Sequence, residues 1–196
     1  PRYGQVPAVT EWGGHALPTV ESLGEFLPEE ETHRPLDTLL SSEAGPFETS
    51  HPTLRHHWAE FEPGRVPRML ARAGLLDDLS EASFADAVAA IQLGAAEIYQ
   101  SVIADFRSGG ASASLLMPWV FNRVWPSVGM QVIDHSGRPT AGYYAIKRAY
   151  RPDAVWIRAA HEVWAAGEQI DLRIGLVAGA PTERFTVQVW TDTLRP

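Results

Sequence analysis

The stretch PAVTEWGGHALPTVESLGEFL, residues 7–27, sets the fold class of this chain. Its first part is a short apolar run that is broken by one acid and closed by a glycine pair. This pattern predicts a buried strand over Ala8–Trp12, with Glu11 near the C-terminal end. Apolar residues then recur at helical spacing, so a helix is expected over 20–27, with Thr19 as its N-cap.

The residues that follow are less regular. Pro28 is expected to end the first helix, and the acidic run Glu29–Glu31 is predicted to be a solvated surface turn. From residue 35 to 76 the chain is rich in His, Pro and Glu. Short helices are expected there at Leu36–Leu40, at Thr53–Phe61 and at Pro67–Leu75, where a proline suits the first helical position.

Residues 84–107 carry the clearest pattern in the sequence, an apolar residue at every third or fourth position. Such a stripe predicts one long amphipathic helix that packs on a flat surface. Ser83 and Asp86 have the spacing of a capping box, and Gly109 with Gly110 supplies the stop. The stripe consists of Phe84, Val88, Ile91, Ala95, Ile98, Val102 and Phe106.

A second apolar run, SLLMPWV at Ser114–Val120, predicts another strand, buried on both faces. HSGRP at 135–139 is typical of a turn, and Thr140 can cap a last helix over Gly142–Tyr150. Strand, helices, strand and helix in this order favour parallel α/β units.

The pattern changes after Pro152. EQIDLRIGLVA and RFTVQVWTD alternate apolar and polar residues, which predicts a two-faced antiparallel sheet. With Val155–Val163 this gives about three strands, where a β-sandwich needs about seven. We therefore expect two domains, an α/β part over 1–152 and the start of a sandwich over 153–196.

Composition excludes several classes of function. The chain has 196 residues, a formal charge of −8 and no cysteine. An acidic chain lacks the basic face that binds nucleic acid, and no window has the roughly 18 uninterrupted apolar residues of a membrane span. The seven histidines form no metal pattern, and neither a G-x-S-x-G elbow nor a phosphate loop occurs. A folded protein without metal or cofactor is expected, cytoplasmic or secreted.

The ends of the two predicted strands carry the candidate site residues. Glu11 ends the first, and Trp119, Asn122 and Trp125 lie at or just after the end of the second. The carboxyl ends of parallel strands lie at the same edge of a sheet, and this is the edge at which α/β barrels place catalytic groups. An exposed indole beside an amide suits a polyol ligand. From these residues alone a salt-bridged Glu11 and plain core tryptophans, Trp12 among them, are equally good interpretations.

Three segments, in order, resemble one known family. They are residues 10–27, residues 91–107 (IQLGAAEIYQSVIADFR) and residues 118–152 (PWVFNRVWPSVGMQVIDHSGRPTAGYYAIKRAYRP). Together they resemble the β-mannosidases of glycoside hydrolase family 2, with Glu11 on the position of the nucleophile. Arg123 stands where the family usually has Asp, Pro118 where Tyr is common, and Trp12 replaces Phe. The resemblance therefore leaves the sugar open.

This resemblance implies the last two units of a (β/α)8 barrel, followed by an incomplete immunoglobulin-like sandwich. It also implies a retaining β-glycosidase that hydrolyses terminal β-linked sugars through a covalent glycosyl-enzyme intermediate. Glu11 would attack, Trp119 would lie under the sugar ring, and Asn122 would donate to hydroxyls or to the carboxylate. Trp12 and Trp125 would border the same site. Neither metal nor cofactor is implied.

The family's acid/base glutamate lies in an Asn-Glu pair on an earlier strand, and this sequence contains no Asn-Glu. We expect that residue upstream of Pro1, which makes the chain alone inactive and the remainder of the same polypeptide its partner. The alternative is a non-catalytic carbohydrate-binding or interaction module that keeps the tryptophans without the chemistry. A purely structural α/β scaffold is the third possibility.

Overall fold

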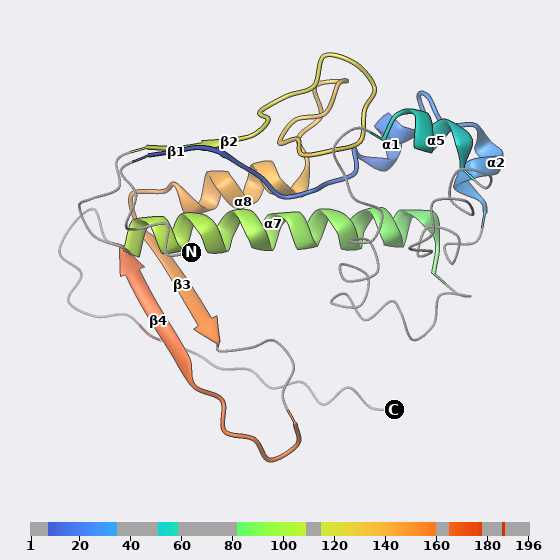
Figure 1. Cartoon of the computed structure of the whole chain (residues 1–196). Coiled ribbons are helices and arrows are strands. Elements are labelled where there is room, and N and C mark those ends of the chain that lie inside the picture. The colour runs from blue at the N-terminus through green and yellow to red at the C-terminus, as the bar shows by residue number, and fades with distance from the viewer. Residues whose placement is uncertain are drawn as a thin grey trace. The chain divides into compact units, whose positions relative to one another are not determined.

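A computed structural model of the chain describes residues 8–34, 51–58, 82–108, 115–159, 165–177 and 186. By its contacts the chain divides into two compact units, Pro1–Tyr150 and Arg151–Pro196. The expected helices at Leu36–Leu40 and Pro67–Leu75 lie outside the described residues. The described elements of the first unit are β1 (Ala8–Trp12), α1 (Val20–Leu23), α2 (Glu29–Thr32), α5 (Pro52–His56), α7 (Phe84–Ser108), β2 (Leu115–Pro118) and α8 (Ala141–Ala149) (Figure 1).

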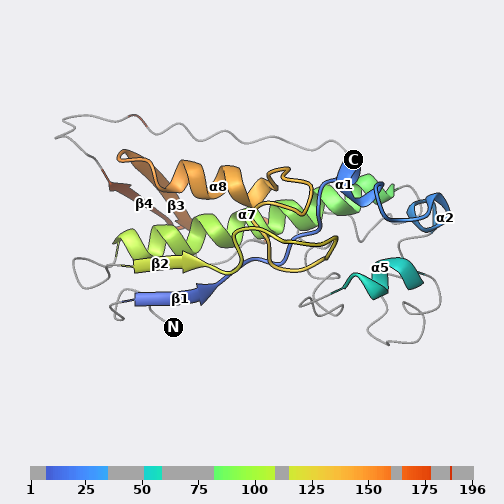
Figure 2. The same cartoon turned by 90° about the horizontal axis from the view of Figure 1, so that it is seen from above.

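The first unit has two layers, a parallel β1–β2 pair on one side and helices α7 and α8 on the other (Figures 1 and 2). Val9 pairs with Leu116 and Trp12 pairs with Pro118, so β1 has one more residue than β2 between these two pairs. This irregularity has the form of a β-bulge. It leaves Val9 partly buried and Trp12 buried against the helices, while the intervening side chains are exposed.

Helix α7 is the core element of this unit, as the apolar stripe predicted. Its N-terminus has the expected capping box: the Ser83 N–H donates to Asp86 Oδ2 (2.9 Å), and the Asp86 N–H donates to Ser83 Oγ (3.2 Å). Its first half packs on Leu17, Leu23, Leu54, Trp58 and Val128, and its second half on Trp12, Ala16, Leu116, Val132 and Ala145. By length and composition α7 could cross a membrane, but 61% of that window is buried inside the structure, as in a core helix.

Strand β2 differs from its prediction of burial on both faces. Only Leu116 is buried, whereas Leu115 and Met117 are 44% and 48% exposed. The reason is that the helices cover one face of the pair and no described element covers the other. Parallel strands are normally covered on both faces, so the apolar side chains of β2 have one partner layer fewer than their composition requires.

The glycine pair after β1 is explained by two close approaches. A Cβ on Gly13 would lie 2.3 Å from the Trp119 carbonyl oxygen, and a Cβ on Gly14 would lie 3.0 Å from the Ala95 backbone of α7. The backbone at Gly13 and Gly14 therefore lies so close to the segment after β2 and to helix α7 that a side chain would not fit. Similarly, a Cβ on Gly142 in α8 would lie 2.8 Å from the Tyr99 ring, which allows α8 to pack tightly on α7.

Helix α1 is shorter than expected and ends at Leu23 with Gly24 as its C-cap, although Thr19 does cap it by accepting from the Ser22 N–H (3.2 Å). The prediction of a solvated turn at 29–31 agrees with the exposure of Glu29 and Glu30 but is wrong for Glu31. These residues begin a helical turn, α2, and Glu31 is only 3% exposed. Its carboxylate accepts from the N–H groups of Thr53 (2.8 Å) and Leu54 (2.9 Å), which would otherwise be unpaired at the start of α5.

The segment after β2 folds back on itself before α8 begins. Val120 donates to the Met130 carbonyl (2.9 Å), and Val132 donates to the Val120 carbonyl (3.1 Å). Thr140 occupies the N-cap of α8, but its hydroxyl donates to the Val132 carbonyl (2.9 Å). The Ala141 N–H donates instead to Gln92 Oε1 of α7 (2.9 Å).

The second unit contains an antiparallel pair, β3 (Ala154–Ala159) and β4 (Leu172–Val177). The register places Val155 opposite Leu176 and Ile157 opposite Ile174, and all four of these side chains are exposed. On the other face the Trp156 ring covers Gly175, where a Cβ would lie 2.1 Å from the indole. The expected sheet-like character of this region is therefore present in the described strands.

Candidate active site

Glu11 lies in β1 within the bulge, one residue before the C-terminal end of the strand. Its side chain is exposed, whereas Val9 and Trp12 pack toward helix α7. Side chains of a strand project to opposite faces, so Glu11 projects from the face of the sheet that the helices do not cover. The carboxylate is therefore available to a ligand at the carboxyl edge of the parallel pair.

Trp12 lies on the other side of the same strand end. Its ring is 8% exposed and meets Tyr99 of α7 edge-on, with ring centroids 5.1 Å apart. A ring buried in this way offers no face to a sugar, so the expected substrate contact of Trp12 does not fit its position. The indole instead supports the backbone that carries Glu11.

Trp119 and Asn122 follow the end of β2 beside that backbone. The Trp119 N–H donates to the Trp12 carbonyl (2.7 Å), which extends the parallel pairing past Pro118. The Trp119 indole is 42% exposed, and Asn122 is exposed too. Asn122 forms a bridge with Ile133 in the returning segment, so the loop that carries its amide is held by backbone contacts. The structure thus brings Glu11 and Trp119 to the same edge of one sheet.

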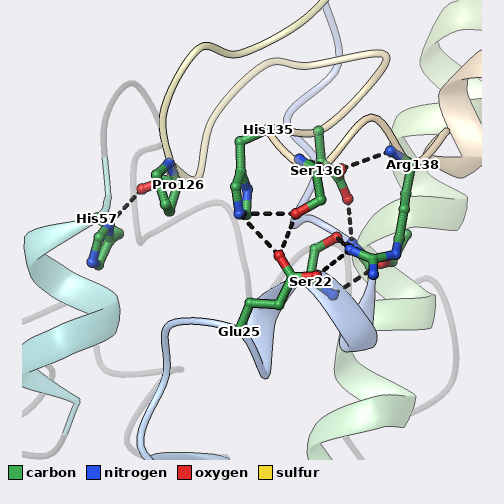
Figure 3. Close-up of polar contacts among 9 residues, drawn as sticks. Ser22, Glu25, His57, Pro126, His135, Ser136 and Arg138 are labelled. Atoms are coloured by element: carbon green, nitrogen blue, oxygen red, sulfur yellow. Dashed lines mark hydrogen bonds and ion pairs between the residues drawn. The ribbon is translucent and has the colours of Figure 1, made fainter.

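Trp125 lies further along this loop and contacts helix α5. Its ring is 43% exposed and packs on His57, with centroids 5.3 Å apart and planes tilted by 36°. His57 Nδ1 is hydrogen-bonded to the Pro126 carbonyl, as Figure 3 shows. The Val128 N–H donates to the His57 carbonyl (2.8 Å), so one histidine anchors three successive parts of the loop. Sequence reasoning missed this contact because α5 is distant in the chain and its histidines have no motif.

A polar network connects the turn at residues 135–139 to helix α1 and the residues just after it (Figure 3). Arg138 Nη1 donates to Glu25 Oε1 (2.6 Å) and to Ser22 Oγ (2.9 Å), and the Ser136 hydroxyl donates to Glu25 Oε2. The hydrogen bond from Ser136, followed by that from Arg138, lowers the pKa of Glu25. Asp134 accepts from the N–H groups of Ser136 (3.1 Å) and Arg138 (2.9 Å), which fixes the turn itself.

The buried histidine of this region, His51, precedes α5 and is fully enclosed. Burial lowers the pKa of His51, and the nearby Glu31 carboxylate acts in the opposite direction. Over the part of the chain that the structure describes, no three His, Cys, Asp or Glu side chains are grouped so that they could hold a metal ion. Among the described residues, the candidate groups at the carboxyl edge are the Glu11 carboxylate, the Asn122 amide and the exposed Trp119 indole.

The carboxyl end of a parallel strand, where Glu11 lies, is the position at which α/β barrels place catalytic groups. No family model matches the chain. β-Mannosidase B of Aspergillus niger is 36% identical to it over 47 residues, and that of Aspergillus flavus is 34% identical over 47 residues. Each match covers 24% of this chain and 6% of the relative, so the chain is similar to a small part of these enzymes.

Two solved structures share the fold. The β-D-mannosidase of Dictyoglomus thermophilum matches with a TM-score of 0.55 and 22% identity, over 77% of this chain and 16% of that one. The exo-chitosanase of Amycolatopsis orientalis matches with a TM-score of 0.52 and 20% identity, over 74% and 16%. The resemblance to β-mannosidases that the sequence indicated is therefore confirmed, and the chain is similar to part of a glycoside hydrolase.

Proposed function

We propose that this chain is the C-terminal part of the catalytic barrel of a retaining, β-mannosidase-like glycosidase, followed by the start of an immunoglobulin-like domain. The observation that carries the proposal is Glu11, exposed at the carboxyl end of a parallel strand and on the face opposite the helices. In a (β/α)8 barrel this face is the interior, and its carboxyl edge holds the catalytic groups. The exposed Leu115 and Met117 then face the barrel interior and are covered by the strands of the remaining polypeptide.

In the proposed reaction the Glu11 carboxylate attacks the anomeric carbon of a β-linked sugar and forms a glycosyl-enzyme ester. A second carboxyl group, about 5–5.5 Å away in retaining enzymes, protonates the leaving oxygen and then activates water. That group comes from the remainder of the polypeptide. The Trp119 indole packs on the C–H face of the sugar ring, and the Asn122 amide donates to a hydroxyl or to the carboxylate.

The proposal is tested by labelling the full-length polypeptide with a 2-deoxy-2-fluoro-β-mannoside and mapping the modified residue. A stable ester on Glu11 is expected, and Glu11→Gln is expected to abolish both labelling and turnover. Labelling of another carboxylate would remove Glu11 from the mechanism. Turnover of an aryl β-mannoside by residues 1–196 alone, lost in Glu11→Gln, would show that the chain contains its own proton donor.

The exposure of Trp119 and Trp125 also favours a second candidate function, a carbohydrate-binding module without chemistry. Both candidates predict sugar binding, but only the hydrolase requires the carboxylate. A full-length protein that never turns mannosides over, and that binds them equally well with and without the Glu11→Gln substitution, supports the binding module.

A further inference from the structure

Tyr99 of helix α7 is the side chain on which the end of β1 packs. Its ring is fully buried and meets the Trp12 indole edge-on, with ring centroids 5.1 Å apart and ring planes at 68°. Helix α8 also comes close to this ring, since a Cβ on Gly142 would lie 2.8 Å from it. Because protein interiors are close-packed, a ring in contact with two other elements has little freedom to move.

The bulge in β1 makes the direction of Glu11 depend on this packing. Between its pairs at Val9 and Trp12, β1 has one residue more than β2, so regular pairing does not determine how Glu11 projects. The next residue is held twice, because the Trp12 carbonyl accepts from the Trp119 N–H (2.7 Å) and the Trp12 ring packs on Tyr99. Neighbouring side chains of a strand project to opposite faces. A Trp12 ring held against the helices therefore keeps the exposed Glu11 side chain on the other face.

We propose that Tyr99 is a positioning residue for Glu11 and acts through the Trp12 ring. The inference rests on the proposed function and deepens it, because it names the group in the helix layer that aligns the nucleophile at that site. Attack on an anomeric carbon requires a near-attack geometry, and a displacement of about 1 Å can cost about 100-fold in rate. Tyr99 is fully buried and does not contact the sugar, so its loss slows the covalent step and leaves binding unchanged.

The test compares variants of the full-length polypeptide in their labelling by a 2-deoxy-2-fluoro-β-mannoside. Tyr99→Leu removes the ring that meets Trp12, and at saturating reagent the rate constant for ester formation on Glu11 is expected to fall about 10- to 100-fold. The reagent concentration that gives half the maximal rate should change by less than about twofold, because only the transition state is affected. Tyr99→Phe keeps the ring and should be labelled at the wild-type rate.

Ile91→Ala is the matched control for a general loss of stability. Ile91 is also fully buried in α7, but it belongs to the apolar cluster that does not contain Trp12. The amount of ester formed at completion counts the folded sites, whereas the rate constant reports how well each site is aligned. Ile91→Ala is expected to lower at most the amount and to keep the rate constant. A rate constant for Tyr99→Leu equal to that of Ile91→Ala would overturn the positioning role.

Gly142→Ala decides the question if Tyr99→Leu does not fold. Alanine is favoured over glycine in a helix, but the new methyl group would lie 2.8 Å from the Tyr99 ring and would displace it. The rate constant for labelling is then expected to fall about threefold or more, although α8 does not carry the nucleophile. A wild-type rate constant in folded Gly142→Ala would then count against Tyr99.

The outcomes separate this inference from the function on which it rests. If the wild-type polypeptide is labelled on Glu11 and Tyr99→Leu is labelled equally fast, the positioning role is wrong and the proposed nucleophile stands. If the wild-type polypeptide is not labelled on Glu11, the proposed function is wrong and the positioning role is wrong with it.

Discussion

The two small sheets of this chain differ in how far their apolar side chains are buried. Trp12 and Leu116 of the parallel pair are buried against α7 and α8, whereas Val155 and Ile157 of the antiparallel pair are 55% and 59% exposed. Parallel strands require a long crossover, and here the crossover includes the core helix itself. An antiparallel ribbon forms by local pairing, but two strands alone are marginally stable in water. Among the described residues, the first unit therefore buries its sheet against helices, whereas the apolar side chains of the β3–β4 pair stay exposed.

Truncation of one isoleucine in each unit tests this difference most strongly. Ile91→Ala in α7 is expected to cost about 3 kcal/mol of unfolding free energy, because Ile91 is fully buried and leaves a cavity. Ile157→Ala in β3 is expected to cost less than about 0.5 kcal/mol, because its side chain is exposed. Urea denaturation of both variants measures the costs. Equal costs would mean that β3 is packed as tightly as the core helix.

The close contact at Gly13, just after β1, gives the next largest expected change in stability. Gly13→Ala is expected to lose about 2 kcal/mol of unfolding free energy, because the new methyl group would overlap the Trp119 carbonyl at 2.3 Å. Gly24→Ala is the matched control, since its Cβ would lie 3.5 Å or more from any neighbour and its φ of −64° suits any residue. Thermal unfolding compares the two. A tolerated Gly13→Ala would contradict the close approach of β1 and the Trp119 loop.

The packing of α7 on both strands and α8 can be examined at high pH. Burial raises the pKa of Tyr99, with the Gly14 backbone acting in the opposite direction, so the folded state keeps the phenol neutral where the unfolded chain ionises. The contribution of Tyr99 to folding stability is therefore fully present below its ordinary pKa of 10.0 and is lost as the pH rises through the folded pKa. Tyr99→Phe should reduce this loss. Tyr150, whose pKa burial also raises, titrates in both proteins and cancels.

The exposed network around Glu25 should contribute least. Its pKa is lowered by Ser136 and Arg138, so its contribution is present above the ordinary value of 4.5 and is lost as pH falls through the folded pKa. Glu25→Gln should therefore lower stability slightly at neutral pH and flatten the acid limb of the stability curve. His51 titrates in both proteins and cancels in the comparison. An unchanged acid limb would mean that the network contributes nothing measurable in solution.

Much of the first unit could be predicted from the sequence because its signals are local. The apolar stripe of α7, its Ser83–Asp86 capping box and the run before the glycine pair each depend on neighbouring residues alone. Glu11 could be placed at a strand end for the same reason. Its exposure on the face opposite the helices follows from the alternation of side chains once Trp12 is known to pack on Tyr99.

What could not be predicted depends on contacts between distant segments. Glu31 reads as one more acid in a solvated run, yet it is buried because the N–H groups of Thr53 and Leu54 need an acceptor. Trp125 reads as a partner of Trp119, but the ring that it packs on is His57. The expected burial of β2 on both faces failed for another reason. An apolar composition indicates that a strand needs a covering layer on each face, but among the described residues only the face toward α7 and α8 is covered.

Gln92 of α7 restricts which substitutions this unit can accept. Its Nε2 donates to the Leu17 carbonyl (3.1 Å), and its Oε1 accepts from the Ala141 N–H (2.9 Å), so one side chain joins the segment after β1 to the start of α8. A carboxamide presents both a donor and an acceptor on one planar group, which matches these two partners. Glutamate at position 92 would place an oxygen against the Leu17 carbonyl, and lysine would place hydrogens against the Ala141 N–H. This position therefore requires a side chain that both donates and accepts, whatever its size or charge.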